Sequence, residues 1–209
     1  MVEKQNEFSF LSRDSMKHWG FVTVMEHQRL GLIGGYLVLN PLGRPNEFHC
    51  TSPVRTTRPQ EILYGSTLNA FLYGEQIAQI LIAKAKIKPF AVVTDKPQVL
   101  AVQEFVEMPI CYVCHTTWES EKNMRIDAAE MSDLAEANGV MTEIASIPGL
   151  SAFRWSEHHV GRYPVAVPEL VARPTAETVD ELKNVSSVID FLEPFERIRL
   201  AIEEAQKAA

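Results

Sequence analysis

The sequence predicts an α+β fold: a mostly antiparallel sheet with the core order β-β-β-α-β-β, a long helix on one face, and further helices near the C-terminus. Residues 20–54 contain three runs rich in apolar and β-branched residues, separated by short turns. Strands joined by short turns are expected to pair antiparallel. Residues 66–87 then carry apolar side chains at the spacing of one helical face. A meander followed by a long helix indicates an α+β architecture.

The three expected strands are separated by recognisable turns. The runs GFVTVME and RLGLIGGYLVLN flank the polar pair HQ, and EFHCTSPV follows the turn NPLGRPN. Gly34 and Gly35 interrupt the second of these runs, and we interpret them as a β-bulge.

The expected helix has a defined start and an early break. Pro59 suits the first helical turn, where its missing N–H needs no partner. Gly65 is expected to separate a short first helix from the long helix over residues 66–87. The apolar face of the long helix comprises Leu68, Phe71, Leu72, Ala78, Leu81, Ile82 and Ala85.

The second half of the chain returns to strand and then to helix. FAVV reads as a buried strand, TDKPQ as a turn, and residues 99–108 as a longer strand. An acidic helix over residues 125–139 and a proline-containing arm over residues 162–174 precede the C-terminal helices. We therefore expect an irregular lead-in over 1–19, an α+β core over 20–118, and residues 119–209 packed on that core as one domain.

The charge of the chain argues against a nucleic-acid partner. Lysine and arginine number 20, aspartate and glutamate 27, and the net charge is −7. Binding of a phosphate backbone needs a concentrated basic face. The one basic cluster, Lys84, Lys86 and Lys88, is interpreted as lysines that offset the dipole at a helix C-terminus. We therefore expect no binding to nucleic acid.

Composition also indicates the compartment. Three cysteines are too few for the disulfide framework of a small secreted protein. The N-terminal residues contain no apolar signal segment, and the longest apolar run, LGLIGGYLVLN, is too short to cross a bilayer. We expect a cytoplasmic protein with no membrane partner.

The segment Cys111-Tyr-Val-Cys114-His115 has the pattern of a haem c attachment site or of half a zinc site. Its two cysteines bracket β-favouring residues, and residues three apart on a strand point to opposite faces. We interpret both cysteines as buried small hydrophobes and predict no cofactor. Zinc held by Cys111, Cys114, His115 and His158 is the alternative, and a redox pair or haem is a more distant one.

A second candidate site lies near the end of the third expected strand. His49, Arg55 and Arg58 precede the predicted start of the first helix, and helix N-termini attract anions. We predict that these three residues bind an anion; surface positions without a ligand are the alternative. The sequence contains no phosphate-binding loop, serine-nucleophile motif or zinc-protease motif.

The sequence shows no pattern that identifies a known family. The missing catalytic motifs favour a non-catalytic interaction or assembly subunit, and the alternative is a small metal- or thiol-dependent enzyme that uses the Cys111/Cys114/His115 region. The region 163–209 is the expected contact with a protein partner or with a second copy of the chain. Its helix carries a large apolar face of Phe191, Leu192, Phe195 and Ile198. Docking of that face on the chain's own sheet is the alternative.

Overall fold

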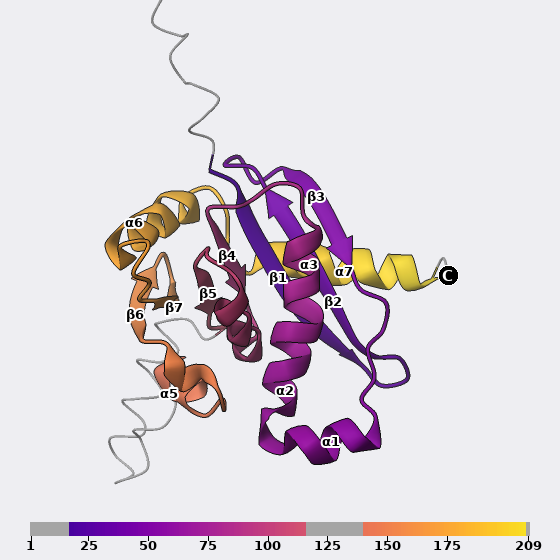
Figure 1. Cartoon of the computed structure of the whole chain (residues 1–209). Helices are drawn as coiled ribbons and strands as arrows, with labels where there is room; N and C mark the ends of the chain where they lie inside the picture. The colour runs from indigo at the N-terminus through magenta and orange to yellow at the C-terminus, as the bar shows by residue number, and fades with distance from the viewer. Residues whose placement is uncertain (1–16, 116–139, 208–209) are drawn as a thin grey trace, which may run out of the picture.

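The computed structural model describes residues 17–115 and 140–207. Within these residues, seven strands form one sheet in the order β3-β2-β1-β4-β5-β7-β6, with helices on both faces (Figure 1). The strands are β1 Trp19–His27, β2 Gly31–Leu39, β3 Pro45–Cys50, β4 Ala91–Thr94, β5 Ile110–Val113, β6 Trp155–Val160 and β7 Tyr163–Pro168. The helical segments are α1 Arg58–Tyr64, η2 Gly65–Thr67, α2 Leu68–Ala70, η3 Phe71–Gln79, α3 Ile80–Lys84, η4 Pro97–Phe105, α5 Val140–Ala145, η5 Leu150–Ala152, α6 Thr175–Ser186 and α7 Glu193–Lys207.

The sheet is mixed: most of its strand pairs are antiparallel, as expected, and its centre is parallel. The expected meander of β1, β2 and β3 is confirmed, since both of its pairs are antiparallel. The pairs β5–β7 and β6–β7 are antiparallel too. In the centre, however, β1 pairs with β4 and β4 with β5 in parallel. The mixed α+β class is therefore confirmed, and the parallel centre brings the carboxyl ends of β1, β4 and β5 to one edge of the sheet.

Each face of the sheet has its own apolar core. On one face, Val22 and Val24 of β1 pack in a cluster with η3 and α3. On the other, Phe21 packs in a cluster with α6 and α7. Alternation along β1 separates these side chains. Figure 1 shows α2 and α3 across one face of the meander and α7 across the opposite face.

The long helix is close to its expected position. Helical segments run from η2 through α3 without a break, and a π-helical stretch, η3, forms the middle. Gly65 ends α1 with a positive φ of 51° and separates it from the next helical segment, as expected. Thr57 caps α1: its hydroxyl accepts from the Gln60 backbone N–H, and the Gln60 side chain accepts from the Thr57 N–H.

Gly34 and Gly35 do not form the expected bulge. They pair regularly with Val24 and Thr23 of β1, and the irregularity in β2 lies between residues 38 and 39. Their role is to let two helices approach. A Cβ on Gly34 would lie 2.1 Å from Ile77 Cγ2, and a Cβ on Gly35 would lie 2.2 Å from Ile198 Cγ2. One glycine therefore admits η3 on one face, and the other admits α7 on the opposite face.

The prediction of a strand over residues 99–108 is wrong. Pro97–Phe105 forms 3₁₀ turns, and the strand begins only at Ile110. The Gln103 side chain stabilises this turn, because its amide donates to the carbonyls of Val106 and Met108 while its oxygen accepts from the Ile110 N–H. A run of apolar residues fits both a strand and a buried 3₁₀ segment, and the side-chain contacts decide between them.

The prediction of an extended arm or edge strand in the proline-containing segment 162–174 is also wrong. β7 is an inner strand between β5 and β6. Pro164 and Pro168 lie at the ends of the ladder, and the Pro164 carbonyl still accepts from the Cys114 N–H. Prolines at strand ends remove no hydrogen bond that the ladder needs.

The apolar face near the C-terminus is covered by the chain itself. Phe191, Phe195 and Ile198 are buried, and the two phenylalanine rings lie 6.4 and 5.7 Å from the ring of Phe21. Docking of this face on the sheet is therefore confirmed, and these side chains are not available to a partner.

Some expectations lie outside the described residues: most of the irregular lead-in over 1–19 and the whole acidic helix over 125–139. None of the described helices is long and apolar enough to cross a membrane. The cytoplasmic location stays a prediction.

We predict that Gly34→Ala and Gly35→Ala each destabilise the protein by about 1–3 kcal/mol, the usual cost of an overpacked core. Each added methyl collides with an isoleucine of the facing helix. Urea unfolding followed by circular dichroism measures the effect. Pairing Gly34→Ala with Ile77→Ala, and Gly35→Ala with Ile198→Ala, is the control, because each removes the clash. Double variants that cost the full sum of their single variants would contradict this packing.

Candidate functional site

The centre of the candidate site is Asp95, the residue that follows β4. Its side chain is fully buried and lies on the α7 face, the same face as Val93. Asp95 Oδ2 has two partners: the Arg199 guanidinium, which donates a short hydrogen bond, and His115 Nε2 at 3.2 Å. Partners of this kind are needed, because an unpaired buried charge is costly.

Helix α7 brings Arg199 to Asp95. Its neighbour in sequence, Ile198, packs against Gly35, so the helix lies close to the sheet and the Arg199 side chain reaches the end of β4. Arg199 Nη1 also lies 3.6 Å from Glu196 Oε2, one turn earlier in α7. About a quarter of the Arg199 side chain is exposed, 26%. Its guanidinium therefore contacts a buried carboxylate on one side and reaches the surface on the other.

His115 comes from the neighbouring parallel strand. β4 and β5 run in the same direction, with Val93 opposite Cys111, so the residues after each strand meet at one edge. The His115 side chain is half exposed, 51%. A histidine held by a buried carboxylate and open to solvent can exchange a proton with a bound molecule.

Thr23 on β1 completes the buried side of the cluster. Its hydroxyl is close enough to lower the pKa of Asp95. Neither Thr23 Oγ1 nor Asp95 Oδ1, however, completes a hydrogen bond of good geometry, and both atoms are buried. Asp95 Oδ2 therefore accepts hydrogen bonds from two side chains, while Oδ1 has no hydrogen bond of good geometry.

Two opposing effects determine the protonation of Asp95. Burial by itself raises the pKa of a carboxyl group. Hydrogen bonds from His115 and Thr23, together with the positive charges of Arg199 and Lys96, outweigh burial and hold the pKa of Asp95 below its ordinary value of 3.8. The carboxylate is therefore ionised at neutral pH, and it balances the charge of Arg199.

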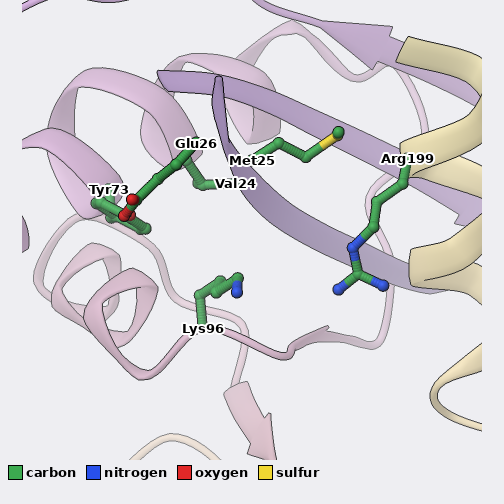
Figure 2. Close-up of a pocket in the computed structure, with 6 residues that line it drawn as sticks. All are labelled: Val24, Met25, Glu26, Tyr73, Lys96 and Arg199. Carbon is green, nitrogen blue, oxygen red and sulfur yellow. The ribbon is translucent and has the colours of Figure 1, made fainter. Parts of the chain in front are cut away.

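A pocket of about 440 Å³ opens beside this cluster. Figure 2 shows Lys96 and Arg199 projecting into a shared space, while Glu26 turns to Tyr73 at the other end. The Tyr73 hydroxyl donates to Glu26 Oε1 at 2.6 Å. Burial raises the pKa of Tyr73 most, and the hydrogen bond to Glu26 and the charge of that carboxylate raise it further. The lining residues are Val24, Met25, Glu26, Tyr73, Lys96 and Arg199. The pocket therefore has a cationic end beside Asp95 and an anionic end beside Tyr73.

The structure does not bring the cysteines of the C-x-x-C-H segment together. Cys111 and Cys114 are buried, as expected, and they belong to the apolar cores on opposite faces of the sheet. Burial raises the pKa of Cys111 to about 12, so its thiol stays protonated. His115 pairs with Asp95 instead, and His158 Nε2 lies 2.9 Å from Ser156 Oγ. The expectation that no cofactor binds stays a prediction.

The three residues of the expected anion site each have a separate partner. His49 Nε2 lies 3.0 Å from Glu47 Oε2. Arg55 donates to the carbonyls of residues 29 and 30, and Arg58 Nη1 donates to Glu61 Oε2 at 3.0 Å. They do not converge on one space, and their binding of an anion stays a prediction.

Sequence reasoning missed most of the site. Asp95 and His115 each come within two residues of the end of a short apolar strand, and in neighbouring parallel strands that position marks a shared edge. This signal was present but depends on knowing that the strands are parallel. No local pattern indicates Arg199, because only the packing of α7 places it.

Structures of endonuclease V share this fold. The structure of human ENDOV has a TM-score of 0.54 at 12% identity and covers 93% of this chain and 87% of that chain. The catalytic domain of human Endonuclease V has a TM-score of 0.50 at 14% identity, with coverage of 93% and 85%. A Ciona intestinalis Endonuclease V in complex with inosine-containing DNA reaches only 0.46 at 11% identity, with coverage of 95% and 89%. No family model and no curated protein matches the sequence.

This likeness contradicts two expectations from the sequence. A non-catalytic interaction or assembly subunit is wrong as the interpretation of this chain, because the fold over nearly its whole length is one that endonucleases have. The exclusion of nucleic acid as a partner is wrong for the same reason. In the alternative enzyme that uses the Cys111/Cys114/His115 region, the two thiols cannot act as a pair, since they belong to cores on opposite faces of the sheet.

The described residues do not fit a divalent metal centre. Nucleases commonly use such ions, and Mg²⁺ or Ca²⁺ needs several oxygen ligands. Across residues 17–115 and 140–207, no three His, Cys, Asp or Glu side chains gather as ligands would. Asp95 is the single buried carboxylate of the cluster just described, and Arg199 already neutralises it.

We predict that Asp95→Asn destabilises the protein by about 3 kcal/mol at neutral pH, as expected when one partner of a buried ion pair is removed. Because the folded-state pKa of Asp95 is lowered, its contribution is present above about pH 4 and is lost as the pH falls through the folded value. The difference between wild type and variant should therefore shrink in acid. Urea unfolding at a series of pH values measures it.

The control for this prediction is Glu193→Gln, which breaks the exposed pair with Arg197 on the same helix. It should cost under about 1 kcal/mol. A gap between wild type and Asp95→Asn that stays constant down to pH 2 would contradict the assignment of an ionised, stabilising Asp95.

Proposed function

We propose that this chain is a nucleic-acid-processing enzyme that binds a phosphodiester in the pocket lined by Lys96 and Arg199 and hydrolyses it beside His115. The observation that carries the proposal is the cluster at the carboxyl edge of the parallel strands, where Arg199 and His115 share the buried Asp95 carboxylate. Open sheets of this kind commonly bind ligands at that edge. The fold shared with human Endonuclease V supports a phosphodiester as the ligand.

The net charge of −7 does not oppose this proposal. Recognition of one phosphodiester depends on the charges that surround the phosphate, not on the total charge of the chain. Lys96 and Arg199 face the same space in Figure 2, and guanidinium and ammonium groups are the usual partners of phosphate oxygens. With two such cations among the described residues that line the pocket, we expect a low overall affinity and a modest salt dependence.

The roles of the side chains follow from their positions. His115, oriented by Asp95, takes a proton from an attacking water as the new P–O bond forms. The P–O bond to the leaving oxygen breaks, and solvent water protonates that oxygen. Lys96 and Arg199 stabilise the negative charge on the phosphoryl oxygens. Tyr73 and Glu26, at the other end of the pocket, offer a hydroxyl and a carboxylate to polar groups of the base or sugar.

We predict that the protein binds and cleaves at least one labelled oligonucleotide from a panel. The panel contains DNA and RNA, single-stranded and duplex, with and without an inosine. Lys96→Ala should weaken binding by roughly 10-fold, with a smaller salt slope. His115→Asn should bind like wild type and cleave about 10²–10⁴-fold more slowly. Fluorescence anisotropy measures binding, and denaturing gels measure cleavage.

The matched control is His18→Asn, at a histidine whose ring lies 3.3 Å from the Asn46 amide. His18 precedes the start of β1, away from the carboxyl edge. It should bind and cleave like wild type. Failure of every oligonucleotide to bind would refute the proposed function, and equal cleavage by His115→Asn and wild type would refute the role of His115.

A further inference from the structure

Three features of the cluster around Asp95 bear on whether it binds a divalent cation. Asp95 Oδ2 is occupied by Arg199 and His115. Asp95 Oδ1 is buried and has no hydrogen-bond partner of good geometry among the described residues. The adjoining pocket is lined by the same Arg199 and by one further cationic side chain, Lys96. Among the described residues, a divalent ion at Asp95 would find one further oxygen of that carboxylate and the positive side chains of Arg199 and Lys96, while Glu26 lies at the other end of the pocket beside Tyr73.

That environment opposes a metal ion on physical grounds. Hard divalent cations bind through several oxygens, usually with more than one carboxylate among them. Like charges at close range in a partly buried site repel strongly. The guanidinium of Arg199 already supplies one positive charge at the carboxylate, in a planar form that holds oxygen pairs well. The same group can contact a phosphate on its exposed side.

We infer that Arg199 takes the place of a divalent cation at this centre, so that the site receives a phosphodiester without a metal ion. The phosphodiester part of this inference rests on the proposed function. The metal part rests on the surroundings of Asp95, namely Arg199, His115 and Lys96, and needs no assumption about the substrate. The two parts are therefore tested by separate measurements.

Free wild-type protein provides the first measurement. Its melting temperature is followed while MnCl₂ or MgCl₂ is raised to about 10 mM at constant ionic strength, since any ligand that binds only the folded state raises that temperature. We expect no saturable rise with either ion. A saturable rise in wild type that Asp95→Asn removes would overturn the inference. This measurement needs no nucleic acid, so it decides the metal question even where the proposed function fails.

Binding of an oligonucleotide provides the second measurement. With EDTA and with Mg²⁺ at matched ionic strength, the affinity should agree within about twofold. Arg199→Met should weaken binding by roughly 10-fold under both conditions, and Arg199→Lys should weaken it less, since it keeps the charge but not the planar fork. Arg197→Met, two residues away on α7 and paired with Glu193, is the matched control and should bind like wild type.

Each outcome of the second measurement bears on one claim. Binding that requires Mg²⁺ and survives Arg199→Met would overturn the substitution of metal by Arg199. Loss of binding in Arg197→Met equal to that in Arg199→Met would overturn it too, because the effect would then belong to α7 in general. Circular dichroism at the assay temperature confirms that each variant is folded before it is compared.

Discussion

The ion pair between Asp95 and Arg199 connects the end of β4 to helix α7, the two elements on which the candidate site depends. Asp95 follows a short central strand and is buried with its charge intact. Arg199 belongs to the last helix, more than one hundred residues later in the chain. A buried carboxylate is stable only with partners in place, so the end of β4, the end of β5 and the helix α7 must assemble together.

The sheet and its glycines make this assembly possible. The parallel pairing of β1, β4 and β5 brings Asp95 and His115, which follow β4 and β5, to the level of Thr23 in the middle of β1. Gly35 lets α7 pack close against the meander, and that close approach sets the reach of Arg199. The pocket adjoins this cluster, since Arg199 lines both and Lys96 follows Asp95 directly in the chain (Figure 2). Stability and proposed chemistry therefore depend on one set of contacts.

The sequence predicts the meander and the long helix well, because turns and helical periodicity are local signals. It does not predict that β7 is an inner strand, because the prolines at its ends resemble those of an edge strand. The site is harder still. Asp95 reads as part of a turn and His115 as the end of a metal motif, and only the parallel register brings them together. Arg199 resembles any surface arginine of an amphipathic helix until α7 is docked.

A double-mutant cycle between Asp95→Asn and Arg199→Met tests the central claim most directly. Unfolding free energies of wild type, both single variants and the double variant give the coupling between the two side chains, independent of ligand or metal. We predict a favourable coupling of about 1–3 kcal/mol at neutral pH, in the range found for residues in direct contact, and a smaller one in acid, where Asp95 is protonated. Coupling within about 0.3 kcal/mol of zero at neutral pH, as for independent sites, would contradict the account.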